Sequence, residues 1–92
     1  MAKKRTRLEI IRDILEVIRS RQGRIKPTHI LYKSNLSHQM MEEYLSELIK
    51  GNLIREEKKG NSKTYFITEK GQKYLSQYAV IASFTSSFGI EN

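Results

Sequence analysis

The sequence predicts a small α+β domain that is mostly helical. Three observations support this prediction. Apolar residues recur at helical spacing in four separate segments, a run rich in β-forming residues follows a basic loop that contains glycine, and 92 residues suffice for only one small core. Apolar residues make up 38% of the chain and charged residues 29%, which is typical of a folded domain.

The first helix is expected to begin at residue 6, after a flexible basic arm formed by residues 1–5, which has no apolar anchor. Thr6 and Glu9 have the spacing of a capping box, in which each side chain accepts a hydrogen bond from the backbone of the other residue. Gln22 and Gly23 are expected to end this helix. The stripe that should face the core contains Leu8, Ile11, Ile14, Leu15 and Ile18.

Two further helices are expected in the middle of the chain. Residues 24–26 suit a short strand or turn, and Pro27 suits the first position of a brief second helix because its missing N–H has no acceptor there. Ile30 and Leu31, with Tyr32 as a further candidate, should form its buried side. Ser37 is a good N-cap for a third helix from His38 to Lys50, whose apolar stripe is Met41, Tyr44, Leu45, Leu48 and Ile49.

A hairpin and a last helix are expected after the left-handed stop at residues 51–52. Residues 53–57 and 63–68 have the composition of two strands, joined by a basic loop at residues 58–62. Thr68 should cap the last helix, whose apolar positions are Tyr74, Leu75, Tyr78, Ile81 and Ala82. The segment from residue 83 to residue 92 is left without an assigned structure.

This order of elements is that of a winged helix-turn-helix, which has a three-helix core, a β-hairpin wing and a C-terminal helix. The predicted organisation is a basic arm at 1–5, a winged helix-turn-helix domain at 6–68, and a C-terminal helix and tail at 69–92 that serve dimerisation.

Four short segments resemble a known family over roughly residues 5–75, namely residues 6–11, 35–37, 51–54 and 65–71. They are similar to the 10a-type archaeal DNA-binding proteins and their small winged-helix relatives. The resemblance implies a dimeric DNA-binding protein, either a chromatin component or a transcriptional regulator, in which the last helix pairs two subunits. The family's long C-terminal coiled coil is not expected here, because only about 20 residues follow Gly71 and they include Gly89. The dimer geometry of the family is therefore not carried over.

The charge distribution favours an anionic partner. The chain carries a formal charge of +7, and residues 1–26 contain nine basic against three acidic residues. This charge suits the backbone of a nucleic acid, although a membrane-surface or ribosomal protein would have a similar balance. Cysteine is absent, and no apolar run is long enough to span a bilayer. We therefore expect a cytoplasmic, nucleoid-associated protein with double-stranded DNA as its partner and no membrane partner.

The DNA-contacting candidates fall in four groups. Ser37, His38 and Gln39 lie at the start of the third helix, where a recognition helix reads base edges, although Glu42 and Glu43 would face phosphates unfavourably. The alternative for this helix is a solvated face with shape-based binding. Candidates for phosphate contact lie in the arm, beside the second helix and in the wing, and each could instead be an ordinary solvated residue: Lys3, Lys4, Arg5, Arg7, Thr28, Lys33, Lys58, Lys59 and Lys63.

The apolar residues after Leu75 are more than a three-helix core with a wing can cover, which favours a homodimer over a segment folded back on its own domain. The expected seam is Tyr74, Tyr78, Ile81, Phe84 and Phe88.

No catalytic constellation is visible, so no enzymatic activity, cofactor or metal is expected. His29 and His38 are the only histidines, and neither has a second ligand at metal spacing. The alternative function is a protein-docking winged helix without direct DNA binding, in which the acidic third helix would meet a basic partner. RNA binding is less favoured, because no aromatic platform for base stacking is apparent.

Overall fold

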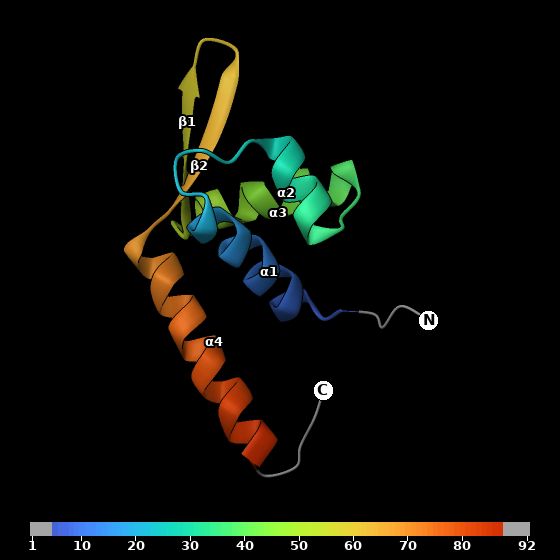
Figure 1. Ribbon diagram of the computed structural model, residues 1–92, viewed down its shortest axis with the longest axis vertical. Helices are drawn as coiled ribbons and strands as arrows, with labels where there is room; N and C mark the ends of the chain where they lie inside the picture. Colours follow the sequence, from blue (N-terminus) through green and yellow to red (C-terminus); the bar gives the residue numbers. More distant parts are fainter. Residues whose placement is uncertain (1–4, 88–92) are drawn as a thin grey trace.

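The computed structural model describes residues 5–87, with the side chains of residues 5–83. The expected order of elements is confirmed, and the helices surround the base of a hairpin that projects from them (Figure 1). The elements are α1 (Arg7–Ser20), α2 (Pro27–Ser34), α3 (His38–Lys50), β1 (Ile54–Lys59), β2 (Ser62–Ile67) and α4 (Glu69–Ser87).

The capping box at the start of α1 is confirmed. The Glu9 N–H donates to Thr6 Oγ1 at 3.2 Å, and the Thr6 N–H donates to Glu9 Oε1 at 2.8 Å. The prediction that Leu8 faces the core is wrong, because its side chain is 57% exposed, whereas Ile10 is buried. Periodicity identifies the apolar face of a helix, but it does not show how far along that face the neighbouring elements extend.

The helix pair α2–α3 is joined by the turn that the sequence predicts. Asn35 adopts the left-handed conformation with φ 53°, and Ser37 caps α3 by accepting a hydrogen bond from the Met40 N–H at 3.2 Å. Leu36, between them, is buried. The suggestion that Tyr32 belongs to the buried side is wrong, because α2 turns Ile30 and Ser34 inward and leaves Tyr32 79% exposed.

The hairpin strands reach closer to the tip of the wing than predicted. They extend to Lys59 and Ser62, so the loop shrinks to Gly60 and Asn61, and Gly60 has a φ of 61°. Glycine adopts this backbone conformation without the steric penalty of a side chain. The end of the wing packs on nothing and therefore lacks the apolar alternation by which a strand is recognised in sequence. Of the short strand or turn expected at residues 24–26, the structure shows a turn that ends in a single bridge between Ile25 and Tyr65.

The side chain of Gln22 adds to this small sheet through contacts that no sequence pattern predicts. Its Oε1 accepts a hydrogen bond from the Ile67 N–H at 2.5 Å, and its Nε2 donates to the Ile67 carbonyl at 3.3 Å. The adjacent Gly23 N–H donates to the Tyr65 carbonyl at 3.2 Å. These contacts join the end of α1 to β2, and they fix the orientation of the wing relative to the helices.

The last helix begins as predicted and runs further than predicted. Thr68 Oγ1 accepts a hydrogen bond from the Gly71 N–H at 3.1 Å, which caps α4, and the helix continues through Ser87. Its first half packs against α1, with Leu75 buried, while its second half extends away from the other elements (Figure 1). Among the helices described, none is long and apolar enough to cross a membrane.

Candidate nucleic-acid interface

The first turn of α3 presents a row of exposed side chains. His38 and Gln39 both point to solvent, as predicted for residues that could read base edges. The Ser37 hydroxyl is engaged in capping the helix through the Met40 N–H. Met40, which the sequence analysis did not single out, is also 39% exposed on this turn and offers an apolar contact of the kind that recognises a thymine methyl group.

The acidic residues of α3 have partners within the chain. Gln39 Nε2 donates to Glu43 Oε1 at 3.3 Å, and His38 Nε2 lies 4.0 Å from Glu42 Oε1, one helical turn away in each case. The carboxylate of Glu47 forms an ion pair with Arg7 of α1, at a distance of 2.6 Å. This hydrogen bond raises the pKa of Arg7 above its ordinary value. Of these contacts, the ion pair with Arg7 reduces the repulsion that the carboxylates of α3 would exert on a phosphate.

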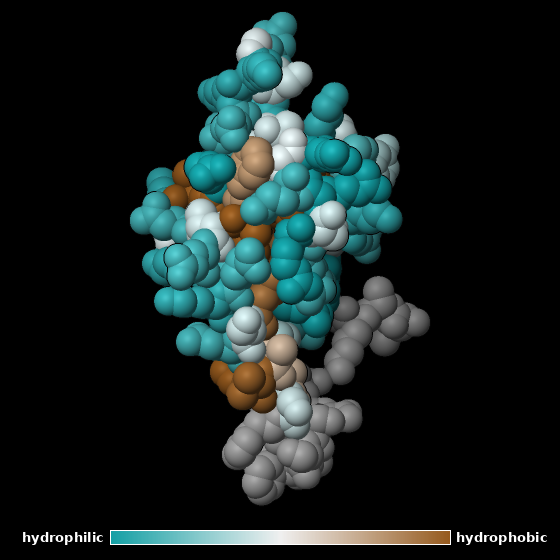
Figure 2. All heavy atoms as spheres, turned by 60° about the vertical axis from the view of Figure 1, so that its left-hand side comes forward, coloured by the Kyte–Doolittle hydropathy of each residue, from teal (hydrophilic) through white to brown (hydrophobic). Residues whose placement is uncertain are grey.

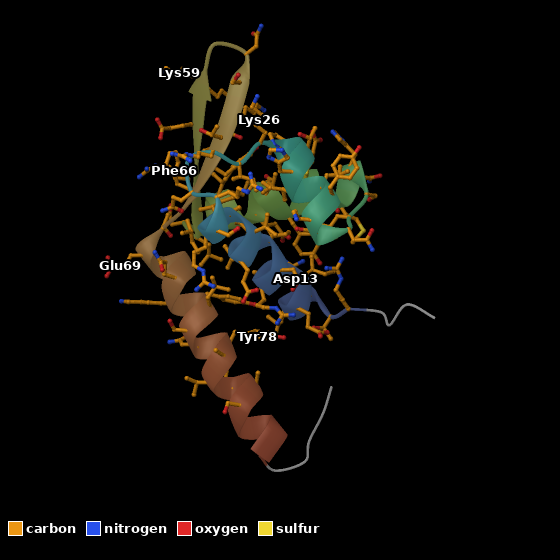
Figure 3. All side chains as sticks on the ribbon, viewed as in Figure 1. Asp13, Lys26, Lys59, Phe66, Glu69 and Tyr78 are labelled. Carbon is orange, nitrogen blue, oxygen red and sulfur yellow. The ribbon has the colours of Figure 1, made fainter. Side chains whose placement is uncertain are left out.

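The hairpin register places the three predicted wing lysines on two different faces of the wing. Lys58 pairs directly with Lys63, whereas Lys59 pairs with Ser62. Because successive side chains of a strand alternate between faces, Lys58 and Lys63 share the face of Tyr65, which is turned toward α3. Lys59 lies on the other face near the end of the wing (Figure 3). On that outer face the Arg55 guanidinium lies 4.8 Å from the centre of the Phe66 ring.

A hollow of about 250 Å³ separates α3 from the inner face of the wing. At its wall, the Tyr65 hydroxyl donates to Glu56 Oε2 at 3.1 Å. Burial raises the pKa of Tyr65 to about 12, and the hydrogen bond to Glu56 adds to this shift. Tyr65 therefore remains a neutral donor at physiological pH. The residues that line the hollow are Glu42, Leu45, Ser46, Ile49, Glu56, Lys63 and Tyr65.

The candidate residues of the basic arm fall into two sets. Lys3 and Lys4 lie outside the described residues. Arg5 is held inside the domain, where it donates to Asp13 Oδ2 at 2.6 Å and to the Ser34 carbonyl at 2.6 Å. Arg7 contacts Glu47, and its guanidinium lies 5.4 Å from the centre of the Tyr44 ring. The structure thus gives Arg5 and Arg7 contacts that join α1 to the helix pair.

The two candidates on α2 point in different directions. Thr28 is exposed in the first turn of the helix. Lys33 lines a hollow between α1 and α2, together with Arg21 and His29. None of the residues that line this hollow comes from α3 or the wing.

Two aromatic residues of α4, Tyr74 and Tyr78, pack on their own domain. The Tyr74 hydroxyl donates to the Leu8 carbonyl at 3.2 Å, and its ring stacks on Tyr78 with 6.3 Å between ring centres. Burial raises the pKa of Tyr74 above its ordinary value. The Arg12 guanidinium lies 5.2 Å from the centre of the Tyr78 ring, and Asp13 lies one residue further along α1 (Figure 3).

The other residues of the expected seam are not covered by the domain or are not described. Ile81 is 63% exposed, and Val80 beside it is 68% exposed. The side chain of Phe84 and the whole of Phe88 lie outside the described part of the chain.

Comparisons with known proteins agree with this architecture. A family model described as winged helix-turn-helix matches residues 4–86. No curated protein matches the sequence. Sso10a-2, a DNA-binding protein from Sulfolobus solfataricus, has a similar fold, with a TM-score of 0.77 and 22% identity over 91% of this chain and 85% of that one.

Two other solved structures share the fold at lower identity. SSV1 F-93 has a TM-score of 0.68 and 17% identity, covering 96% of this chain and 95% of that one. A variant of MepR from S. aureus, solved with a bound oligodeoxyribonucleotide, has a TM-score of 0.72 and 14% identity, covering 87% of this chain and 60% of that one. The resemblance to the 10a type is thus confirmed at the level of the fold. From the family match and this architecture together, the chain belongs to the winged helix-turn-helix family.

Proposed function

We propose that this chain binds double-stranded DNA as a homodimer and acts as a transcription regulator or chromatin component. In this proposal the first turn of α3 enters the major groove, and the wing lies along the neighbouring phosphates. Sso10a-2 is a DNA-binding protein and the MepR variant was solved with an oligonucleotide, which supports the same role for this fold.

The observation that carries the proposal is the pair formed by Lys58 and Lys63. Like charges directly opposite each other across a hairpin destabilise it, yet these two residues are cross-strand partners on the exposed outer part of the wing. A phosphate between the two ammonium groups would remove the repulsion. The pair also shares the face of the wing turned toward α3, so one DNA duplex could contact both elements.

Lys3, Lys4 and Thr28 extend this surface in the proposal. Lys3 and Lys4 precede Arg5 in sequence, and Arg5 donates to the carbonyls of Ser34 and Asn35, two to three residues before the N-cap of α3. Thr28 supplies a hydroxyl at the start of α2, where backbone N–H groups also favour a phosphate.

DNA affinity measured by fluorescence anisotropy tests the proposal, with a labelled duplex at about 50 mM and about 200 mM salt. We expect Lys63→Glu to weaken binding and to reduce the slope of log K against log salt by about 1. This variant faces Lys58 with a carboxylate and should keep the hairpin folded. Lys73→Glu, which makes the same charge change on α4, is the matched control. Absence of binding at the lower salt concentration, or equal affinities for the two variants, would contradict the proposal.

The homodimer part of the proposal rests on the second half of α4. The helix turns Leu75 and Tyr78 toward its own domain, whereas Val80 and Ile81 remain exposed. Apolar side chains gather there on the surface (Figure 2), beside a shallow hollow of about 310 Å³ that Ser76 and Gln77 complete. A second copy would bring the same self-complementary patch to this face, as in most symmetric dimers.

A binding role is favoured over catalysis and over docking to a basic protein. The proposed surface consists of groups that contact phosphates and bases, and it presents no pair of a nucleophile and a base. The docking alternative depends on free carboxylates along α3, but the Glu47 carboxylate already forms an ion pair with Arg7 within the chain.

A further inference from the structure

A hollow of about 320 Å³ between α1 and α2 has a chemistry that the proposed DNA surface does not use. It opens between the C-terminal half of α1 and one flank of α2. Its lining residues are Val17, Ser20, Arg21, Ile25, His29 and Lys33.

Apolar and basic residues line this hollow together. Ile25 is 1% exposed, and Val17 beside it is half-buried. The hollow is also lined by three basic residues, Arg21, His29 and Lys33. No carboxylate is among the lining residues. Within the described part of the chain, none of these three side chains has a hydrogen bond or an ion pair. The acidic residue nearest to them in sequence, Glu16, is not part of the lining.

Helix-end electrostatics explain only part of this arrangement. Arg21 follows the last residue of α1, and Lys33 lies in the last turn of α2, so each cation is favoured by the partial negative charge of a helix C-terminus. That effect acts on each residue separately. It does not explain why Arg21 and Lys33 line the same hollow as the apolar residues Val17 and Ile25. His29, one turn before Lys33, lines this hollow too.

We infer that this hollow binds a small organic acid. Its carboxylate would lie among Arg21, His29 and Lys33, where charge-assisted hydrogen bonds are strong. Its apolar body would cover Val17 and Ile25. The volume lies at the lower end of the range of ligand pockets, about 300 to 1,000 Å³, so the ligand is compact. Because no lining residue comes from α3 or the wing, this site is separate from the proposed DNA surface.

The test is a titration of the isotope-labelled full chain with benzoate, followed by NMR. We expect saturable shifts of the Val17, Ile25 and His29 backbone amides. Benzamide, which has the same ring without the charge, should shift them far less. Lys33→Glu should weaken benzoate binding about tenfold or more, since one charge-assisted contact is replaced by a repulsion. Lys73→Glu is the control for net charge, and the amide spectra of both variants show whether the fold is retained.

Three results would overturn the inference. One is a benzoate titration that stays linear without saturation, and another is equal binding of benzamide. The third is a duplex DNA that shifts the same amides and is displaced by benzoate, because the hollow would then be a site for backbone phosphates. A failure of DNA binding by itself leaves the benzoate titration unaffected, so the two proposals fail separately.

Discussion

Gly71 lies where α4 passes closest to the segment that leads into the hairpin. A Cβ at this position would overlap the Leu53 carbonyl oxygen and would lie 2.7 Å from Ile67 Cγ1. The same Leu53 carbonyl accepts a hydrogen bond from the Thr68 N–H at 3.1 Å, and the Thr68 hydroxyl lies within hydrogen-bond distance of it and of the Asn52 carbonyl, so it cannot move away without loss of these contacts. Glycine is thus required at position 71 because there is no space for a Cβ.

We expect Gly71→Ala to lower the free energy of unfolding by about 1 to 3 kcal/mol, the usual cost of overpacking. Gly51→Ala is the matched control, because a Cβ there would lie 3.4 Å from the nearest atom, the Glu47 carbonyl oxygen. Urea unfolding of both variants measures the difference. Equal stabilities would show that the chain relaxes around residue 71.

At the scale of the elements, Arg5 joins α1 to the turn between α2 and α3. It contacts Asp13 and the Ser34 carbonyl, each at 2.6 Å, and the side chains of Arg5 and Asp13 are only 29% and 24% exposed. A guanidinium can reach both acceptors because its donors are fixed in a fork. A basic arm at the start of the chain suggests DNA contact, but at residue 5 the structure shows a contact that stabilises the domain.

Arg5→Lys keeps the positive charge and loses the forked arrangement of donors. A stabilising role and a phosphate-binding role for Arg5 therefore predict different stabilities for this variant. For a structural role we expect a loss of about 1 to 2 kcal/mol in the free energy of unfolding, from charge-assisted hydrogen bonds that are partly exposed. We expect little change in the salt slope of DNA binding. Arg5→Ala would show the same loss of stability. Arg5→Ala removes the charge, so an Arg5→Ala variant with wild-type stability and a reduced salt slope would instead identify Arg5 as a phosphate contact.

For the whole molecule, the principal extents of 50 × 32 × 21 Å reflect the two projections, the wing and the second half of α4. The wing is basic by sequence, and Figure 2 shows that it is hydrophilic and that apolar side chains gather on the outer part of α4. We expect these projections to have different partners, namely DNA for the wing and a second copy of the chain for α4.

Sedimentation equilibrium tests the dimer. We expect the wild type to dimerise, and we expect the double variant Val80→Asp, Ile81→Asp to be monomeric, because charges buried in the seam would be unpaired. Tyr32→Asp is the matched control, since Tyr32 is an exposed apolar residue on α2. A monomeric wild type at the concentrations used for DNA binding would rule out the dimer.

The sequence alone determined the elements whose signals are local. Caps such as Thr6, Ser37 and Thr68 depend on residues within a few positions, and the apolar stripes of α1 and α3 depend on periodicity, so the winged helix-turn-helix order could be predicted. Only the tertiary structure decided which exposed positions meet a neighbour. The exposure of Leu8, the role of Gln22, the pairing of Lys58 with Lys63 and the convergence of Arg21 and Lys33 all depend on contacts between distant segments, which no local pattern encodes.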